Sequence, residues 1–209
     1  LMFENDFVAV WILYLKKGEA TSMHCHPRKK SSLIVLSGKV LASTLNEWFE
    51  LSQLGGLIYE AGVFHTTKAL TDDVFVMEIE TPPLKKDLVR LKDAYGRAGK
   101  GYEGKKQMSR DLAKFKYVFF DQKAIKNQDQ KRINSTLISL KVCSSDCLDK
   151  EIDRKKNKIY SIVEEKIIDN NYKSLFGVGS IFDTDSIKNY HEVRLFKNSL
   201  LLTLERNVK

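Results

Sequence analysis

Short apolar runs, many alternating with polar positions, recur through the first 84 residues and predict β-strands. Turn signals such as Ser37-Gly38, Gly55-Gly56 and Ala61-Gly62 separate these runs. Strands spaced this closely, with such turns between them, are typical of an antiparallel sandwich or small barrel. The strands predicted in this block cover residues 7–15, 32–36, 39–44, 48–51, 57–59, 66–70 and 74–79.

The pattern is interrupted after residue 83. Residues 84–120 are typical of irregular or partly helical structure, and the polar segment 121–134 is typical of a linker. Strands resume at 136–142, 158–163, 165–168, 180–182, 192–196 and 199–204. We therefore predict an all-β protein with two domains, 1–84 and 133–209, joined by a partly helical connector, 85–132.

A comparison of the chain with itself indicates that the two domains are related. With a shift of 126 positions (154 − 28), Arg28-Lys29-Lys30 aligns with Arg154-Lys155-Lys156, and His65 aligns with His191. Together with similar apolar segments, these matches favour two β-domains of common design, the second much altered.

Composition narrows the class of protein. Of the 209 residues, 43% are hydrophobic and 30% are charged, which is typical of a globular protein. The longest unbroken apolar run, residues 7–15, is about half of the ~20 residues that a membrane-spanning helix needs. No signal-peptide pattern is visible, and three cysteines without a framework spacing favour a reducing compartment. We expect a cytoplasmic protein with no membrane partner.

The net charge of +8 is concentrated in the predicted connector. Residues 85–132 carry 15 basic and 6 acidic side chains, or +9, whereas residues 1–84 carry 7 and 10, or −3. No helix-turn-helix, finger or RNP motif accompanies this charge, so we expect no nucleic-acid partner. We interpret the connector as a solvated segment that could meet an anionic ligand.

Three of the four histidines are candidate metal ligands. His24 and His26 are two positions apart, and on a strand this spacing places both imidazoles on one face. Ring nitrogens that converge from one face suit a divalent metal. His65, which follows the turn at Gly62, could supply a third nitrogen from another strand.

The spacing around the first two histidines resembles the first motif of the cupin superfamily. Gly18, His24, His26 and Gly38 fit this motif, and Ser31 stands where the family has a metal-binding Glu.

The second cupin motif is matched in part. Gly62 and His65 fit it, while Glu60 and Ala69 replace the family's Pro and Asn. The resemblance implies a jelly-roll barrel that holds one divalent metal ion, Zn, Mn, Fe or Ni, on the three histidines. Water or substrate would fill the remaining positions.

A second resemblance concerns the activity. The segments Met23-His-Cys-His26, Leu33-Ile-Val-Leu-Ser-Gly-Lys39 and Asp87-Leu-Val-Arg-Leu-Lys-Asp-Ala-Tyr-Gly-Arg97 are similar to the cupin domain of type II phosphomannose isomerases. Similar segments occur in small cupins of surface-sugar biosynthesis. The resemblance covers about residues 18–97 and implies a small-molecule substrate, a sugar or sugar-phosphate, and chemistry of the isomerase or epimerase type.

Such a reaction needs a cation to polarise a carbonyl and a base to move a proton from the neighbouring carbon. Candidate bases near the barrel mouth are Glu60, Glu78 and Tyr95. Candidates for pairing with a phosphate or carboxylate of the substrate are Lys30, Arg90 and Arg97.

The second domain lacks the histidine pair. Lys150 and Ile152 take the positions of His24 and His26, so we expect that domain to be metal-free and to serve packing, dimerisation or lid functions. Exposed sheet edges favour a homodimer. Two alternatives to the isomerase stay open: a three-histidine Fe(II) dioxygenase acting on a small polar substrate, and a non-catalytic sugar- or metabolite-binding module.

Overall fold

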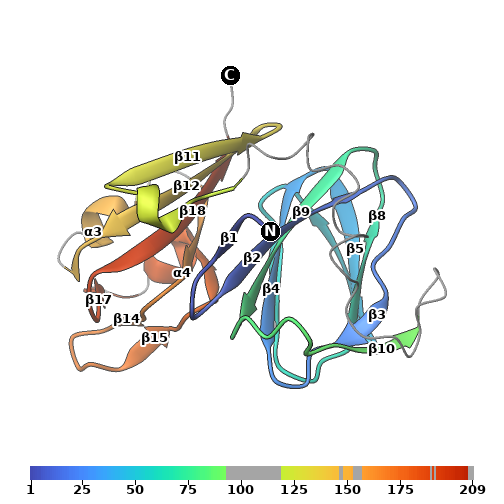
Figure 1. The fold of residues 1–209 in the computed structure, drawn as a ribbon, viewed down its shortest axis with the longest axis horizontal. Coiled ribbons are helices and arrows are strands. Elements are labelled where there is room, and N and C mark those ends of the chain that lie inside the picture. The colour runs from blue at the N-terminus through green and yellow to red at the C-terminus, as the bar shows by residue number, and fades with distance from the viewer. Residues whose placement is uncertain (93–118, 146–147, 153–156, 189, 191, 207–209) are drawn as a thin grey trace.

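A computed structural model describes residues 1–92, 119–145, 148–152, 157–188, 190 and 192–206. Antiparallel strands form four sheets, so the predicted all-β class is confirmed. Figure 1 shows two sandwiches side by side, with the N-terminal strands (blue to green) in one and the C-terminal strands (yellow to red) in the other. No helix among the described residues is long and apolar enough to cross a membrane.

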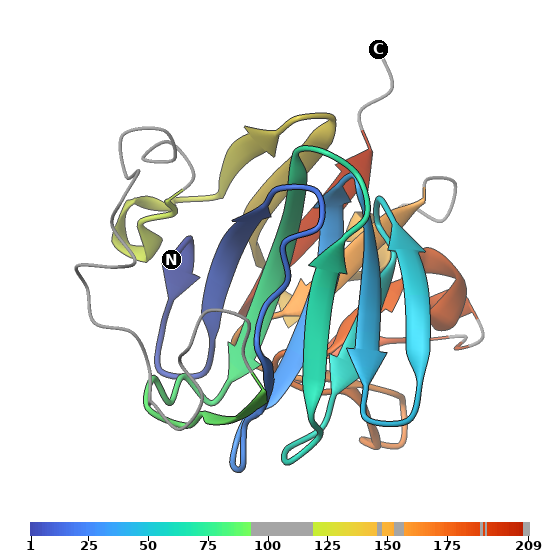
Figure 2. The ribbon, with the colours of Figure 1, turned by 90° about the vertical axis from the view of Figure 1, so that its right-hand side faces the viewer.

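The first sandwich consists of two five-stranded sheets. The inner sheet, named for its position against the second sandwich, has the strand order β1 (Phe3–Glu4), β2 (Ala9–Leu15), β9 (Val74–Thr81), β4 (Lys30–Ser37), β7 (Gly56–Tyr59). The outer sheet has the order β10 (Val89–Lys92), β3 (Met23–Cys25), β8 (His65–Ala69), β5 (Lys39–Thr44), β6 (Trp48–Ser52). The outer sheet lies toward the viewer in Figure 2.

Strand alternation gives the inner sheet two apolar faces. One face turns toward the outer sheet and forms the barrel interior, with buried side chains that include Leu33, Val35, Val74 and Val76. The intervening residues of β4 and β9 point the opposite way, toward the second sandwich. A central sheet buried on both faces therefore separates the barrel interior from the rest of the molecule.

The second sandwich consists of a five-stranded and a three-stranded sheet. The larger has the order β11 (Gln128–Ile133), β12 (Thr136–Cys143), β18 (Ser199–Arg206), β13 (Lys158–Ile162), β16 (Ile181–Asp183). The smaller has the order β15 (Ser174–Phe176), β14 (Ile167–Ile168), β17 (Arg194–Leu195). Short helical segments accompany these sheets: η2 (Gln122–Ala124), α3 (Leu148–Glu151) and α4 (Thr184–Lys188).

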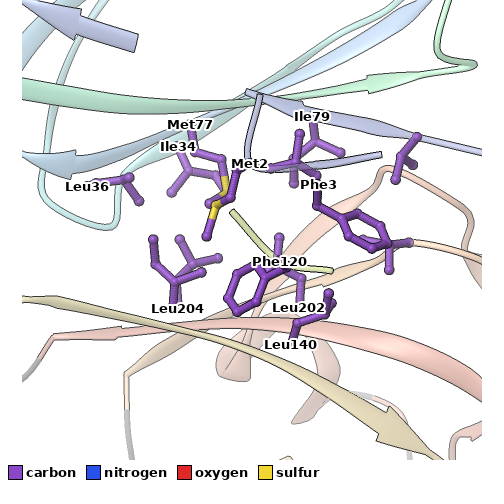
Figure 3. Close-up of a cluster of buried hydrophobic side chains, with 14 of the residues drawn as sticks. Met2, Phe3, Ile34, Leu36, Met77, Ile79, Phe120, Leu140, Leu202 and Leu204 are labelled. Atoms are coloured by element: carbon purple, nitrogen blue, oxygen red, sulfur yellow. The ribbon is translucent and has the colours of Figure 1, made fainter. Parts of the chain in front are cut away.

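The two sandwiches share one hydrophobic core, which Figure 3 shows between the inner sheet and the β11–β12–β18 side of the second sandwich. Ile34 and Met77 reach this core from the inner sheet, and Leu140 and Leu202 reach it from the opposite side. Phe120 is buried between them. Buried hydrogen bonds reinforce the contact, since Ser32 Oγ donates to the Gly179 carbonyl at 2.6 Å.

The described part of the predicted connector contributes strands to both sandwiches. Val89–Lys92 pairs with β3 as β10, although irregular or helical structure was expected there. Gln128–Ile133 pairs with β12 along its whole length, which corrects the linker expected over 121–134. β10 has only four residues and β11 is polar, and pairing with a neighbouring strand outweighs their weak local strand signal. Residues 93–118 lie outside the described ranges.

Candidate metal centre

His24, His26 and His65 come together in the barrel interior. His24 lies on β3 directly opposite His65 of β8, and His26 follows two residues later. All three are buried, and their ring centroids lie 4.5 to 5.5 Å apart. One ring nitrogen from each can be chosen so that all three lie within 4.8 Å of one another. The convergence predicted from the His-x-His spacing is present.

Backbone carbonyls orient each of the three rings. The Nδ1 atoms lie 2.7 Å from Ser22 O for His24, 2.6 Å from Asp87 O for His26 and 3.0 Å from Val63 O for His65. A carbonyl only accepts hydrogen bonds, so we assign the proton of each neutral ring to Nδ1. This assignment leaves the Nε2 lone pair of every ring free, which is the arrangement found in metal-binding histidines.

Burial keeps these imidazoles neutral. The pKa of His24 is lowered to about 3, mainly by desolvation and next by the electrostatic effect of the nearby His65. Desolvation also lowers the pKa of His65 to about 4. The pKa of His26 is lowered by desolvation and by the charge of Lys29. Neutral imidazole is the form that binds a metal, so the rings need not release a proton to do so near neutral pH.

A buried ion pair lies beside the histidines. Glu80 of β9 places Oε1 3.7 Å from His26 Nε2 and 2.8 Å from Lys29 Nζ. Trp11 Nε1 donates a hydrogen bond to the other carboxylate oxygen, Oε2, at 3.1 Å. Neither Glu80 nor Lys29 was among the site residues predicted from the sequence. The alternation along β9 was the available signal for Glu80, because Val74, Val76, Glu78 and Glu80 share one face of that strand.

Two of the sequence-predicted residues lie on this side of the barrel. Glu78 is partly buried on β9, and desolvation, with the neighbouring Glu80, raises its pKa to about 7. Arg90 of β10 lies opposite His24 in the ladder and donates from Nε to Ser22 Oγ at 3.3 Å.

The structure does not bring the other predicted residues to the centre. Lys30 points toward the second sandwich, where Nζ donates to Ser180 Oγ at 3.2 Å. Its neighbours on β4 alternate faces, so it lies on the opposite side of the sheet from Leu33 and Val35. Glu60 is exposed just after β7. Tyr95 and Arg97 fall outside the described residues.

The donor set fits a divalent transition metal. Three imidazole nitrogens with free lone pairs suit Zn, Mn, Fe or Ni, and a buried carboxylate lies within reach of the same space. His24, His26 and His65 would hold the ion.

The first sandwich is an antiparallel double-sheet fold in which the three histidines of the two motifs converge, as the resemblance implied. No protein-family model matches the sequence, and no curated protein matches it either. Solved structures that are similar to this chain match less than half of its length.

Three of these structures illustrate the extent of the similarity. KdgF from Halomonas sp. is 17% identical with a TM-score of 0.38, over 39% of this chain and 76% of its own. A putative sugar phosphate isomerase from Acidithiobacillus ferrooxidans is 17% identical with a TM-score of 0.37, over 40% of this chain and 56% of its own. An uncharacterized protein with a double-stranded β-helix domain from Klebsiella pneumoniae is 16% identical with a TM-score of 0.39, over 44% of this chain and 80% of its own.

Proposed function

We propose that this protein is a metal-dependent cupin that holds one divalent ion on His24, His26 and His65 and acts on a sugar or sugar-phosphate. The observation that supports it most directly is the orientation of the three rings, each with Nδ1 against a carbonyl and Nε2 free. A surface or purely structural cluster does not require three such rings to converge within 4.8 Å.

An aldose–ketose isomerisation or an epimerisation is the reaction type that we assign to this site. His24, His26 and His65 would hold the divalent metal, which would supply a Lewis acid for the substrate carbonyl. Glu78 is our candidate for the proton transfer, because it lies on the face of β9 that also carries Glu80. Arg90, placed beside His24, is our candidate for pairing with an anionic group of the substrate.

Roles for Tyr95 and Arg97, a homodimer and a cytoplasmic location are predictions made from the sequence alone. Glu60 is exposed, and Lys30 contacts Ser180 of the second sandwich. We therefore assign neither residue a role in the proposed reaction. The three-nitrogen face also suits Fe(II), so the dioxygenase remains the second candidate function.

Metal analysis of protein purified without a histidine tag tests the proposal. We expect about one equivalent of metal in the wild type and loss of it in both His26→Ala and His65→Ala, because each removes one nitrogen ligand. His191→Ala is the matched control, since it removes the one histidine outside the cluster and should retain the metal.

The identity of the metal then selects the assay. Iron directs the work to oxygen uptake, and Zn, Mn or Ni directs it to isomerase and epimerase assays. A wild-type protein that holds no metal, even after reconstitution, would contradict both enzyme functions and leave the binding module.

A further inference from the structure

Glu80 is placed to balance the charge of a metal ion at the proposed centre. Three neutral imidazoles leave a bound divalent ion with its full charge in a buried site, and an uncompensated buried charge is costly. The side chain of Glu80 is only 6% exposed, and its Oε1 lies 3.7 Å from His26 Nε2. Ligand atoms of a tetrahedral site with bonds of ~2.0–2.1 Å lie roughly 3.3 Å apart, so little movement would bring both atoms onto one ion.

The surroundings of Glu80 orient it toward the histidines. Trp11 engages Oε2, which leaves Oε1 as the oxygen that faces His26 and Lys29. Glu80 also lies directly opposite Ser31 in the β4–β9 ladder. Ser31 is the position where the cupin motif has its Glu. The carboxylate thus approaches from a neighbouring strand, at a position outside either motif.

Lys29 forms an ion pair with the same carboxylate oxygen, Oε1 of Glu80. Its side chain is 0% exposed, and Nζ has an ion pair with Glu80 but no hydrogen-bond partner among the described residues. A fully buried ammonium needs an anion close by, and Glu80 supplies it. A metal ion bound to Oε1 would place a second cation beside that ammonium, so each cation weakens the hold of the other on Glu80.

We propose that Glu80 is the carboxylate ligand of the metal centre and that Lys29 is a built-in cation that holds this carboxylate and competes with the metal for it. The inference rests on the proposed metal site. It adds a fourth ligand from β9 and a residue that limits the affinity of the site. When no metal is bound, the intact pair would balance the charges of Lys29 and Glu80 against each other.

Opposite effects of two isosteric variants test the proposal. The apparent Kd for Zn²⁺ would be measured for the whole chain by competition with a chelator. We expect Glu80→Gln to weaken binding by about 10- to 100-fold, which is the range for loss of a metal-site partner. We expect Lys29→Met to strengthen binding by about tenfold, because the competing charge is gone.

The double variant Lys29→Met/Glu80→Gln shows whether Lys29 changes the Kd through Glu80. It also removes both buried charges, so no unpaired carboxylate at position 80 threatens folding. If Lys29 acts through Glu80, the Lys29→Met substitution should change the Kd less than threefold in the Glu80→Gln background. Glu50→Gln, which makes the same change of charge at a 57% exposed carboxylate of β6, is the control and should bind Zn²⁺ within about threefold of the wild type. The Co²⁺ absorption spectrum should change in Glu80→Gln and stay the same in Glu50→Gln.

The outcomes separate this inference from the function on which it rests. A wild type that binds no Zn²⁺ overturns the metal site and this proposal together. A wild type that binds, with an unchanged Kd in Glu80→Gln, overturns the fourth ligand alone. Weaker binding in Lys29→Met, or an equal gain from it in the Glu80→Gln background, overturns the competition.

Discussion

At the scale of single residues, Tyr59 has an unusual combination of contacts. Its ring stacks on His65 with 4.2 Å between centroids and 8° between planes. Its hydroxyl is buried and has no hydrogen-bond partner among the described residues. The ring therefore supports a proposed metal ligand, while the hydroxyl carries a desolvation cost without a compensating bond.

Tyr59→Phe should separate these two contributions. We expect the free energy of unfolding to stay the same or to rise by up to about 1 kcal/mol, because the substitution removes an unsatisfied polar group and keeps the stacked ring. Urea unfolding of the metal-free protein measures this. A loss of more than about 1 kcal/mol would show that the hydroxyl has a partner in the folded protein.

Sequence spacing located the histidines but could not locate their charged neighbours. His24 and His26 share a face through local strand geometry, which the i, i+2 spacing contains. Glu80 is close to His26 only because β4 and β9 pair in one particular register and the two sheets then face each other. Lys29 was not among the site residues predicted from the sequence, since burial of a lysine becomes visible only with its partner in place.

At the scale of elements, strand β7 marks the contact between the sandwiches. Gly56 begins this strand, and a Cβ there would lie 2.7 Å from both the Leu33 carbonyl oxygen and Ile181 Cδ1. The carbonyl belongs to the adjacent strand and cannot move without disturbing the β4–β7 ladder. The close approach of two strands and of the second sandwich therefore requires glycine.

Gly56→Ala should accordingly destabilise the protein by about 1–3 kcal/mol, the usual cost of overpacking. Gly177→Ala is the control, because a Cβ at Gly177 meets nothing within 4 Å. It should change stability by no more than about 0.5 kcal/mol. Equal unfolding midpoints in urea for the two variants would contradict the tight contact at β7.

Elements that depend on distant partners were the ones that the sequence pattern described least well. Seven strands of the first sandwich, β2 and β4 to β9, were predicted within a few residues, as for 39–44 and β5 (Lys39–Thr44), whereas the short strands β1 and β3 were not. β10 is short and β11 is polar, and they exist through pairing with β3 and β12, so their local pattern indicated irregular structure and a linker. Their strand character is a property of the sheet rather than of the segment.

At the scale of the whole molecule, the shared core joins the two sandwiches. Phe120 is 1% exposed in this core and its amide donates to the Met2 carbonyl at 2.8 Å. Leu204 belongs to the same core, so residues from near both ends of the described chain meet there. Figure 3 shows the Phe120 ring between Met2 and Leu140. Since each sandwich covers an apolar face of the other, we expect the two to unfold in a single transition.

Phe120→Ala tests this coupling. We expect a loss of about 3–5 kcal/mol, as for other buried aromatic residues, whereas Phe119→Ala should cost little because Phe119 is 52% exposed. Both tryptophans, Trp11 and Trp48, belong to the first sandwich, so their fluorescence reports on that sandwich alone, and far-UV circular dichroism reports on both. The two signals should give coincident midpoints in the wild type and in Phe120→Ala, with both midpoints shifted equally in the variant. Midpoints that separate, or a shift confined to circular dichroism, would show that each sandwich is stable without the core they share.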